Sequence, residues 1–181
     1  REHAAANFDA SQEWFERALR IAPGDATVLL ALAGTLLAKG LPECRAIYEQ
    51  VASANDVREA WLGLAVANLH HRRPTEAAGA LGAVLSQHAH AIADIAAVAD
   101  AVARATRSPG WCALDGTGNV VVSLGSPSSK RNAVSAEIDG RTIPLRRQAG
   151  AQRLVWRLPG SWESATAVAV KIEGNHLLGS P

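Results

Sequence analysis

The chain has 181 residues, of which 48% are hydrophobic and 19% are charged, and its formal net charge at pH 7 is +1. This composition excludes a disordered chain, because it supplies enough apolar side chains for a folded core. The near-zero net charge gives no reason to expect either a nucleic acid or a membrane as a partner.

The cysteines and the apolar runs bear on the compartment. Only Cys44 and Cys112 occur, too few for a disulfide framework or a cysteine metal site, so we expect a reducing, cytoplasmic environment. The longest apolar run, from Ala26 to Ala38, is shorter than the roughly 20 residues that a membrane-spanning helix needs. The chain begins at Arg1 and contains no Met, from which we expect it to be part of a longer or processed protein.

The first half of the chain repeats with a period of 33 residues. This spacing relates three sets of positions, which are Ser11, Cys44 and Ala77; Phe15, Tyr48 and Leu81; and Ala18, Val51 and Val84. Within each repeat the three positions are four and three residues apart, which places them on one stripe of a helix. The small residue lets a second helix approach, and the bulky residue fills the space beyond it.

Each of these helices is expected to pair with a neighbouring helix. Three apolar positions of one repeat correspond to three of the next, Leu29, Leu32 and Ala33 to Trp61, Leu64 and Ala65. Segments 39–43 and 72–76 contain the Gly and Pro residues that end one helix and begin another. The pattern predicts a stack of antiparallel helix pairs, and residues 89–107 predict one more helix that caps the stack.

The repeat resembles a known family. Residues 7–25 resemble the second helix and closing Pro turn of a tetratricopeptide repeat (TPR), and residues 60–65 resemble the opening of its first helix. The resemblance extends over residues 1–90, with departures: no Pro closes the second repeat near Asp56, and Ala89 stands where the third should have Pro. Ankyrin arrays share the 33-residue period, but their Thr-Pro-Leu-His signature is absent. An unrelated helical bundle is the remaining alternative.

The TPR resemblance implies a partner-binding groove. In this family the first helix of each pair lines the concave surface. By that resemblance, the groove residues are Thr27, Leu30, Gly34, Leu37, Glu59, Leu62, Val66, Leu69 and His70. The Lys/Asn set with which some family members clamp a terminal carboxylate is absent. A mostly apolar, shallow groove suits an amphipathic helix or a neighbouring part of the same protein.

After residue 109 the pattern changes to the alternation of β-strands. Apolar residues alternate with polar ones around positions 120–124, 134–138, 143–145, 154–158 and 168–172, and Asp139-Gly140 indicates a hairpin turn. Pro144 cannot donate to a central ladder, so its strand is expected at an edge. The prediction is an α+β chain with two domains, a TPR-like helical domain over residues 1–107 and a small antiparallel β-sandwich over residues 110–181.

No pattern of residues indicates an enzyme or a metal site. Neither a Gly-x-Ser-x-Gly elbow nor a His-Glu-x-x-His motif occurs. His70 and His71 are expected at one end of a helical hairpin and His88 and His90 at the other, too far apart to share an ion. We therefore expect no cofactor and no metal.

The tryptophans and arginines of the second half have two interpretations. Trp111 and Trp162 lie near Pro-Gly turns, where an exposed ring could stack on a sugar, although packing in a core is the favoured interpretation. Several arginines could form a basic face for an acidic partner, namely Arg141, Arg146, Arg147, Arg153 and Arg157.

The function predicted from the sequence is a non-catalytic scaffold that binds a protein or peptide segment in the TPR-like groove. Two alternatives remain open. The chain could be an accessory region of a larger bacterial enzyme, such as a glycosyltransferase, that acts on polysaccharide or sugar-nucleotide substrates, or its β-domain could bind a glycan. The apolar helix at 26–38 could also pair between two copies, giving a homo-oligomer.

Overall fold

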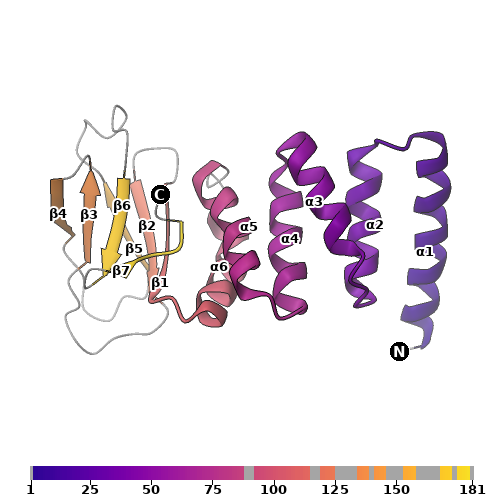
Figure 1. Ribbon diagram of the computed structural model, residues 1–181. Coiled ribbons are helices and arrows are strands. Elements are labelled where there is room, and N and C mark those ends of the chain that lie inside the picture. Colours follow the sequence, from indigo (N-terminus) through magenta and orange to yellow (C-terminus); the bar gives the residue numbers. More distant parts are fainter. Residues whose placement is uncertain are drawn as a thin grey trace. The chain divides into compact units, whose positions relative to one another are not determined.

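The computed structural model describes residues 2–87, 92–114, 119–124, 134–138, 141–145, 153–157, 168–172 and 175–179. Within these residues the chain forms six helices followed by seven strands in two antiparallel sheets (Figure 1). The predicted α+β class is confirmed.

The helices begin and end where the sequence supplies caps and turns. Their bounds are α1 Glu2–Ile21, α2 Ala26–Ala38, α3 Cys44–Asn55, α4 Arg58–His70, α5 Pro74–Gln87 and α6 Ile92–Thr106. The side chain of Asp25 caps α2 by accepting from the backbone N–H groups of Thr27 and Val28, at 2.9 and 3.1 Å. Asp56 adopts the left-handed conformation, with φ 47°, and ends α3.

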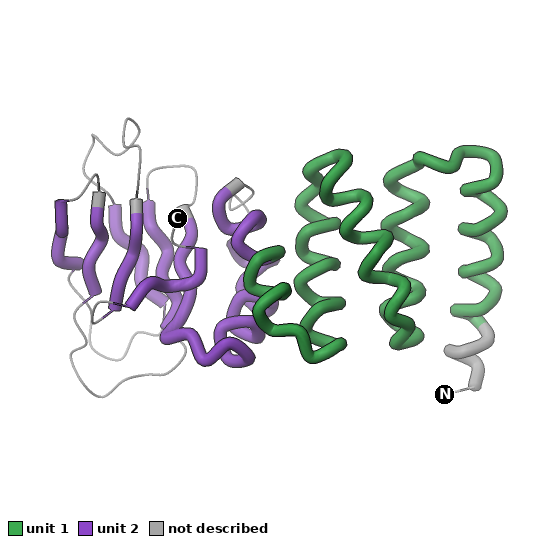
Figure 2. Tube along the Cα trace, viewed as in Figure 1, with its two compact units in different colours: residues 1–80 green, residues 81–181 purple. Residues whose placement is uncertain are grey.

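The chain separates into two compact units, residues 1–80 (unit 1) and 81–181 (unit 2), which Figure 2 distinguishes by colour. The domain boundary expected between residues 107 and 110 differs from this division. Unit 2 contains α6 and the second half of α5 together with the strands. The helix α6 groups with the strands because it packs directly against β1.

In unit 1 the helices pack in chain order. Consecutive helices from α1 to α4 contact one another, and α2 also contacts α4. An apolar cluster of Leu29, Val51, Ala52 and Ala60 joins α2, α3 and α4. Lys39 at the end of α2 ties this helix to α1, because its Nζ donates to Asp9 Oδ1 and to Gln12 Oε1, each at 2.6 Å.

The helical stripe predicted from the period is buried in two of its three copies. Buried side chains are Cys44, Tyr48 and Val51 on α3, and Ala77, Leu81 and Val84 on α5. On α1 the equivalent residues Ser11, Phe15 and Ala18 are only half-buried, because within unit 1 α1 packs mainly against α2 whereas α3 packs against both α2 and α4.

Unit 2 contains two antiparallel sheets. The first has the strand order β1-β2-β5, with β1 Gly110–Leu114, β2 Asn119–Leu124 and β5 Arg153–Arg157. The second has the order β4-β3-β6-β7, with β3 Val134–Ile138, β4 Arg141–Leu145, β6 Val168–Ile172 and β7 Asn175–His176. Pro144 lies in β4, which is the edge strand that its missing N–H predicts.

The two sheets enclose one core. Alternate residues of both sheets meet in a single cluster that includes Cys112, Val120, Val122, Leu124 and Leu154 from the first sheet and Val134, Ala136, Val170 and Ile172 from the second. This clustering follows from the period of two along each strand, which sends every second side chain to the same face.

The outer faces of the sheets differ from each other. On the second sheet Glu137 and Lys171 form an ion pair on the accessible face, as the alternation predicts. On the first sheet Trp111, Ala113, Val121 and Ser123 are buried on the side away from the core cluster. The expected wet face is absent over β1 and β2 because α6 contacts β1, whereas Arg153, Val155 and Arg157 of β5 are exposed on the same face.

Candidate functional site

The nine predicted groove residues lie on two contacting helices of unit 1. Four are on α2 and five on α4. All nine keep solvent exposure: Thr27, Glu59 and His70 are exposed, and Leu30, Gly34, Leu37, Leu62, Val66 and Leu69 are half-buried. Apolar side chains on both helices therefore remain accessible, although the groove itself stays a prediction.

Tyr48 connects these two helices from the side of α3. A Cβ on Gly63 of α4 would lie 2.2 Å from Cε1 of the Tyr48 ring, and a Cβ on Gly34 of α2 would lie 3.7 Å from the Tyr48 hydroxyl. The ring can occupy this position only because residue 63 has no side chain. Burial, followed by the nearby Cys44, raises the pKa of the Tyr48 phenol.

Sequence reasoning missed the role of Gly63. Its signal was a glycine inside a helical pattern, which costs helix stability and so implies a close approach. In the structure this glycine lets a phenol from α3 reach the neighbourhood of Gly34, a predicted groove residue.

The predicted sugar-stacking site does not have the required exposure. Trp111 is 0% exposed, and its Nε1 donates to Asp100 Oδ1 on α6 at 2.6 Å. The guanidinium carbon of Arg153 lies 5.6 Å from the centroid of the Trp111 ring. Trp111 therefore packs under α6 and is not available to stack on a sugar. The alternation of residues along its strand could not reveal this contact. Trp162 lies outside the described residues.

The arginines of the predicted basic face are divided between the two sheets of unit 2. Of its five arginines, Arg141 is exposed on β4 of the second sheet, whereas Arg153 and Arg157 are exposed on β5 of the first. Arg146 and Arg147 lie outside the described residues. The three described arginines thus belong to two sheets rather than to one.

The histidines and cysteines offer little chemistry in the described part of the chain. The His70 and His71 rings are 5.1 Å apart in an edge-to-face arrangement, and His88 and His90 lie outside the described residues. No group of three or more His, Cys, Asp and Glu side chains among the described residues is arranged to hold a metal ion.

Both cysteines are free and buried. Burial raises the pKa of the Cys112 thiol to about 12 and also raises that of Cys44. Because the thiolate is the nucleophile, a thiol with such a pKa is inert near neutral pH.

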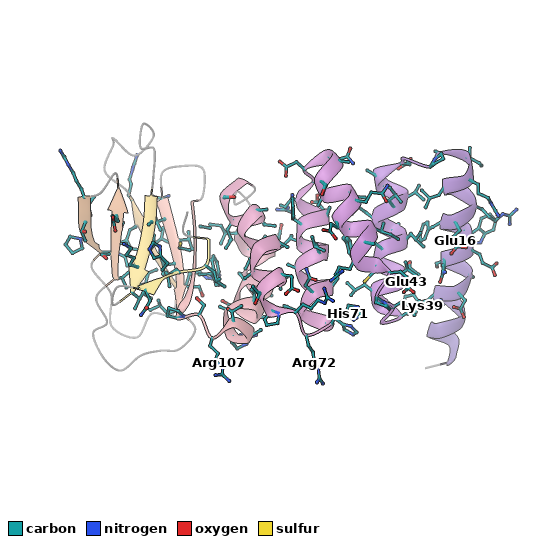
Figure 3. The ribbon with its side chains drawn as sticks, viewed as in Figure 1. Glu16, Lys39, Glu43, His71, Arg72 and Arg107 are labelled. Carbon is teal, nitrogen blue, oxygen red and sulfur yellow. The ribbon has the colours of Figure 1, made fainter. Side chains whose placement is uncertain are left out.

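A surface hollow that the sequence did not predict lies in unit 1. Pro42, Arg45, His71 and Arg73 line it, and its volume is ≈ 320 Å³. We call it the turn hollow, because its lining residues come from the turns before α3 and α5 and from the first turn of α3. Figure 3 shows His71 at the same end of the helices as Glu43. No spacing rule joins residues 42–45 to residues 71–73, so only the fold brings them together.

No helix in the described part of the chain is both long and apolar enough to cross a membrane.

Comparisons with protein-family models, with curated proteins and with solved structures found no match to this chain. The TPR resemblance therefore depends on the quoted residues alone.

Proposed function

We propose that the chain is a non-catalytic protein-interaction module, in which TPR-like helix pairs bind an apolar, amphipathic helix of a partner along α2 and α4. The observation that carries this proposal is the set of accessible apolar side chains on these two contacting helices, namely Leu30, Leu37, Leu62, Val66 and Leu69. Burying several such side chains against a partner contributes about 1.5–3 kcal/mol each when burial is complete.

The chemistry of the described residues agrees with a binding role. The two thiols are protonated near neutral pH, which removes them as nucleophiles. Two reduced cysteines also suit a cytoplasmic location, which belongs to the same proposal.

The experiment is a selection of helical peptides from a displayed library against the full chain. We expect binders with apolar residues at positions i, i+3 or i+4, and i+7, because that pattern places them on one helical face. The double variant Leu62→Asp/Val66→Asp should weaken binding at least about tenfold, because it puts two charges into the contact.

A matched control changes the same number of charges on the exposed face of α3. Gln50 and Ala54 are both exposed there, so Gln50→Asp/Ala54→Asp should bind as the wild type does. Circular dichroism checks that both double variants remain helical. Selected peptides that bind Leu62→Asp/Val66→Asp unchanged, or a library that yields no binder, would contradict the proposal.

A further inference from the structure

The turn hollow gathers positive charge from two separate turns. Arg45 lies in the first turn of α3, and Arg73 directly precedes Pro74, the first residue of α5. The N-terminal ends of both helices therefore lie at the hollow, where their dipoles add partial positive charge. His71, the residue after α4, also lines the hollow.

The donors of these side chains are largely uncommitted. Among the described residues, the side chain of Arg45 makes no hydrogen bond and no ion pair. Arg73 Nη1 lies 3.7 Å from Glu76 Oε1, which is longer than a hydrogen bond, and both side chains are about half exposed. His71 Nε2 is shielded from solvent, so a ligand in the hollow does not reach this atom.

Two guanidinium groups offer planar forks of N–H donors, the geometry that suits phosphate oxygens. A single carboxylate has two oxygens and one charge, whereas a phosphate monoester presents three oxygens and about two charges to the two guanidinium groups.

We propose that the turn hollow binds a phosphate group, held by Arg45 and Arg73. The volume of ≈ 320 Å³ exceeds the size of the ion alone, so the group can be carried by a small phosphorylated molecule as well as be free phosphate. This site is separate from the apolar residues of α2 and α4 and does not depend on the function proposed for them.

The test is a titration of the full chain, labelled with ¹⁵N, with inorganic phosphate at constant chloride concentration. We expect saturable shifts of the backbone amides of residues 43–46, 71–73 and 75 below about 20 mM phosphate, a weak affinity typical of a small ligand. Phosphoserine serves as a second probe. Tighter binding of phosphoserine identifies a phosphate monoester as the source, and tighter binding of inorganic phosphate identifies the free ion.

Two substitutions should move the affinity in opposite directions. Arg45→Gln removes a charged donor and should weaken binding at least about tenfold. Glu76→Gln removes the carboxylate that competes for Arg73 and should tighten binding severalfold.

Matched controls on α1 change the overall charge by the same amounts. Arg20→Gln and Glu13→Gln lie on exposed positions of that helix and should leave the phosphate affinity unchanged. The proposal is overturned if no saturable shift occurs at residues 43–46, 71–73 and 75. It is equally overturned if each variant at the hollow changes the affinity only as much as its control does.

Discussion

The contact between Gly63 and Tyr48 shows how one missing side chain organises three helices. Tyr48 is 7% exposed, and its ring fills the space that a Cβ on Gly63 would need. Cores are packed densely enough that even one added methyl group forces a neighbour to move. The ring lies against backbone here, so it has little freedom to yield.

Gly63→Ala should therefore destabilise the fold by about 1–3 kcal/mol, measured by urea unfolding. Gly79→Ala is the matched control, because Gly79 is an exposed helical glycine with no atom within 4 Å of an added Cβ. The control should be neutral or stabilising by about 0.5–1 kcal/mol, since alanine favours helix over glycine. Adding Tyr48→Leu to Gly63→Ala should restore part of the loss, and equal stability of Gly63→Ala and the wild type would contradict the contact.

The pair of Glu137 and Lys171 makes a pH-dependent contribution. A hydrogen bond from Lys171, followed by its positive charge, lowers the pKa of Glu137 below its ordinary value of 4.5. A carboxyl with a lowered folded-state pKa stabilises the fold above its unfolded-state pKa, and loses that contribution as the pH falls through the folded value.

The stability difference between wild type and Glu137→Gln should thus be present at pH 7 and shrink as the pH falls below 4.5. Chemical unfolding at a series of pH values measures it. The effect is small and salt-dependent because the pair is solvent-exposed. A difference that grows toward acid pH would reverse the sign and refute the assignment.

At the scale of whole elements, α6 belongs with the strands that follow it. Asp100 Oδ1 on α6 accepts from Trp111 Nε1 at 2.6 Å on β1 and from Ser123 Oγ at 3.1 Å on β2. One carboxylate oxygen thereby fixes the helix to two neighbouring strands. The contact also explains why Trp111 and Ser123 are buried on a face that the alternation predicted to be wet.

Asp100→Ala should destabilise unit 2 by about 1–3 kcal/mol, because it leaves the indole N–H of Trp111 buried without an acceptor. Asp100→Asn keeps an acceptor oxygen and should cost less. Arg104→Ala, at an exposed position of the same helix, is the control and should change stability by less than about 0.5 kcal/mol. Equal losses from Asp100→Ala and Arg104→Ala would show that the contact contributes nothing.

The scale of the whole molecule shows which features the sequence could predict. Burial of Cys44, Tyr48 and Val51 was predictable, because one helix determines which of its own residues share a face. The inward faces of the strands were predictable for the same reason. Each of these signals depends only on residues that lie a few positions apart in the chain.

Features that join distant segments could not be predicted in this way. Sugar stacking stayed open for Trp111 beside the favoured packing, because nothing within its strand indicates that α6 covers it. The turn hollow combines Arg45 with Arg73, residues from two turns that only helix packing brings together. The boundary between compact units shifted into α5 because the attachment of α6 to the sheet is likewise a tertiary contact.

The last described residues have a consequence for the order in which the protein folds during synthesis. Leu178 exchanges backbone hydrogen bonds with Gly110 and Cys112, and Leu177 completes the core between the two sheets. These contacts span more than sixty positions of the chain, whereas the contacts among α1 to α4 join elements that follow closely in sequence. During translation the helices of unit 1 can fold early, because their contacts need no later part of the chain. The two sheets of unit 2 cannot finish folding until Leu177 and Leu178 have emerged from the ribosome, and their apolar strands stay exposed until then.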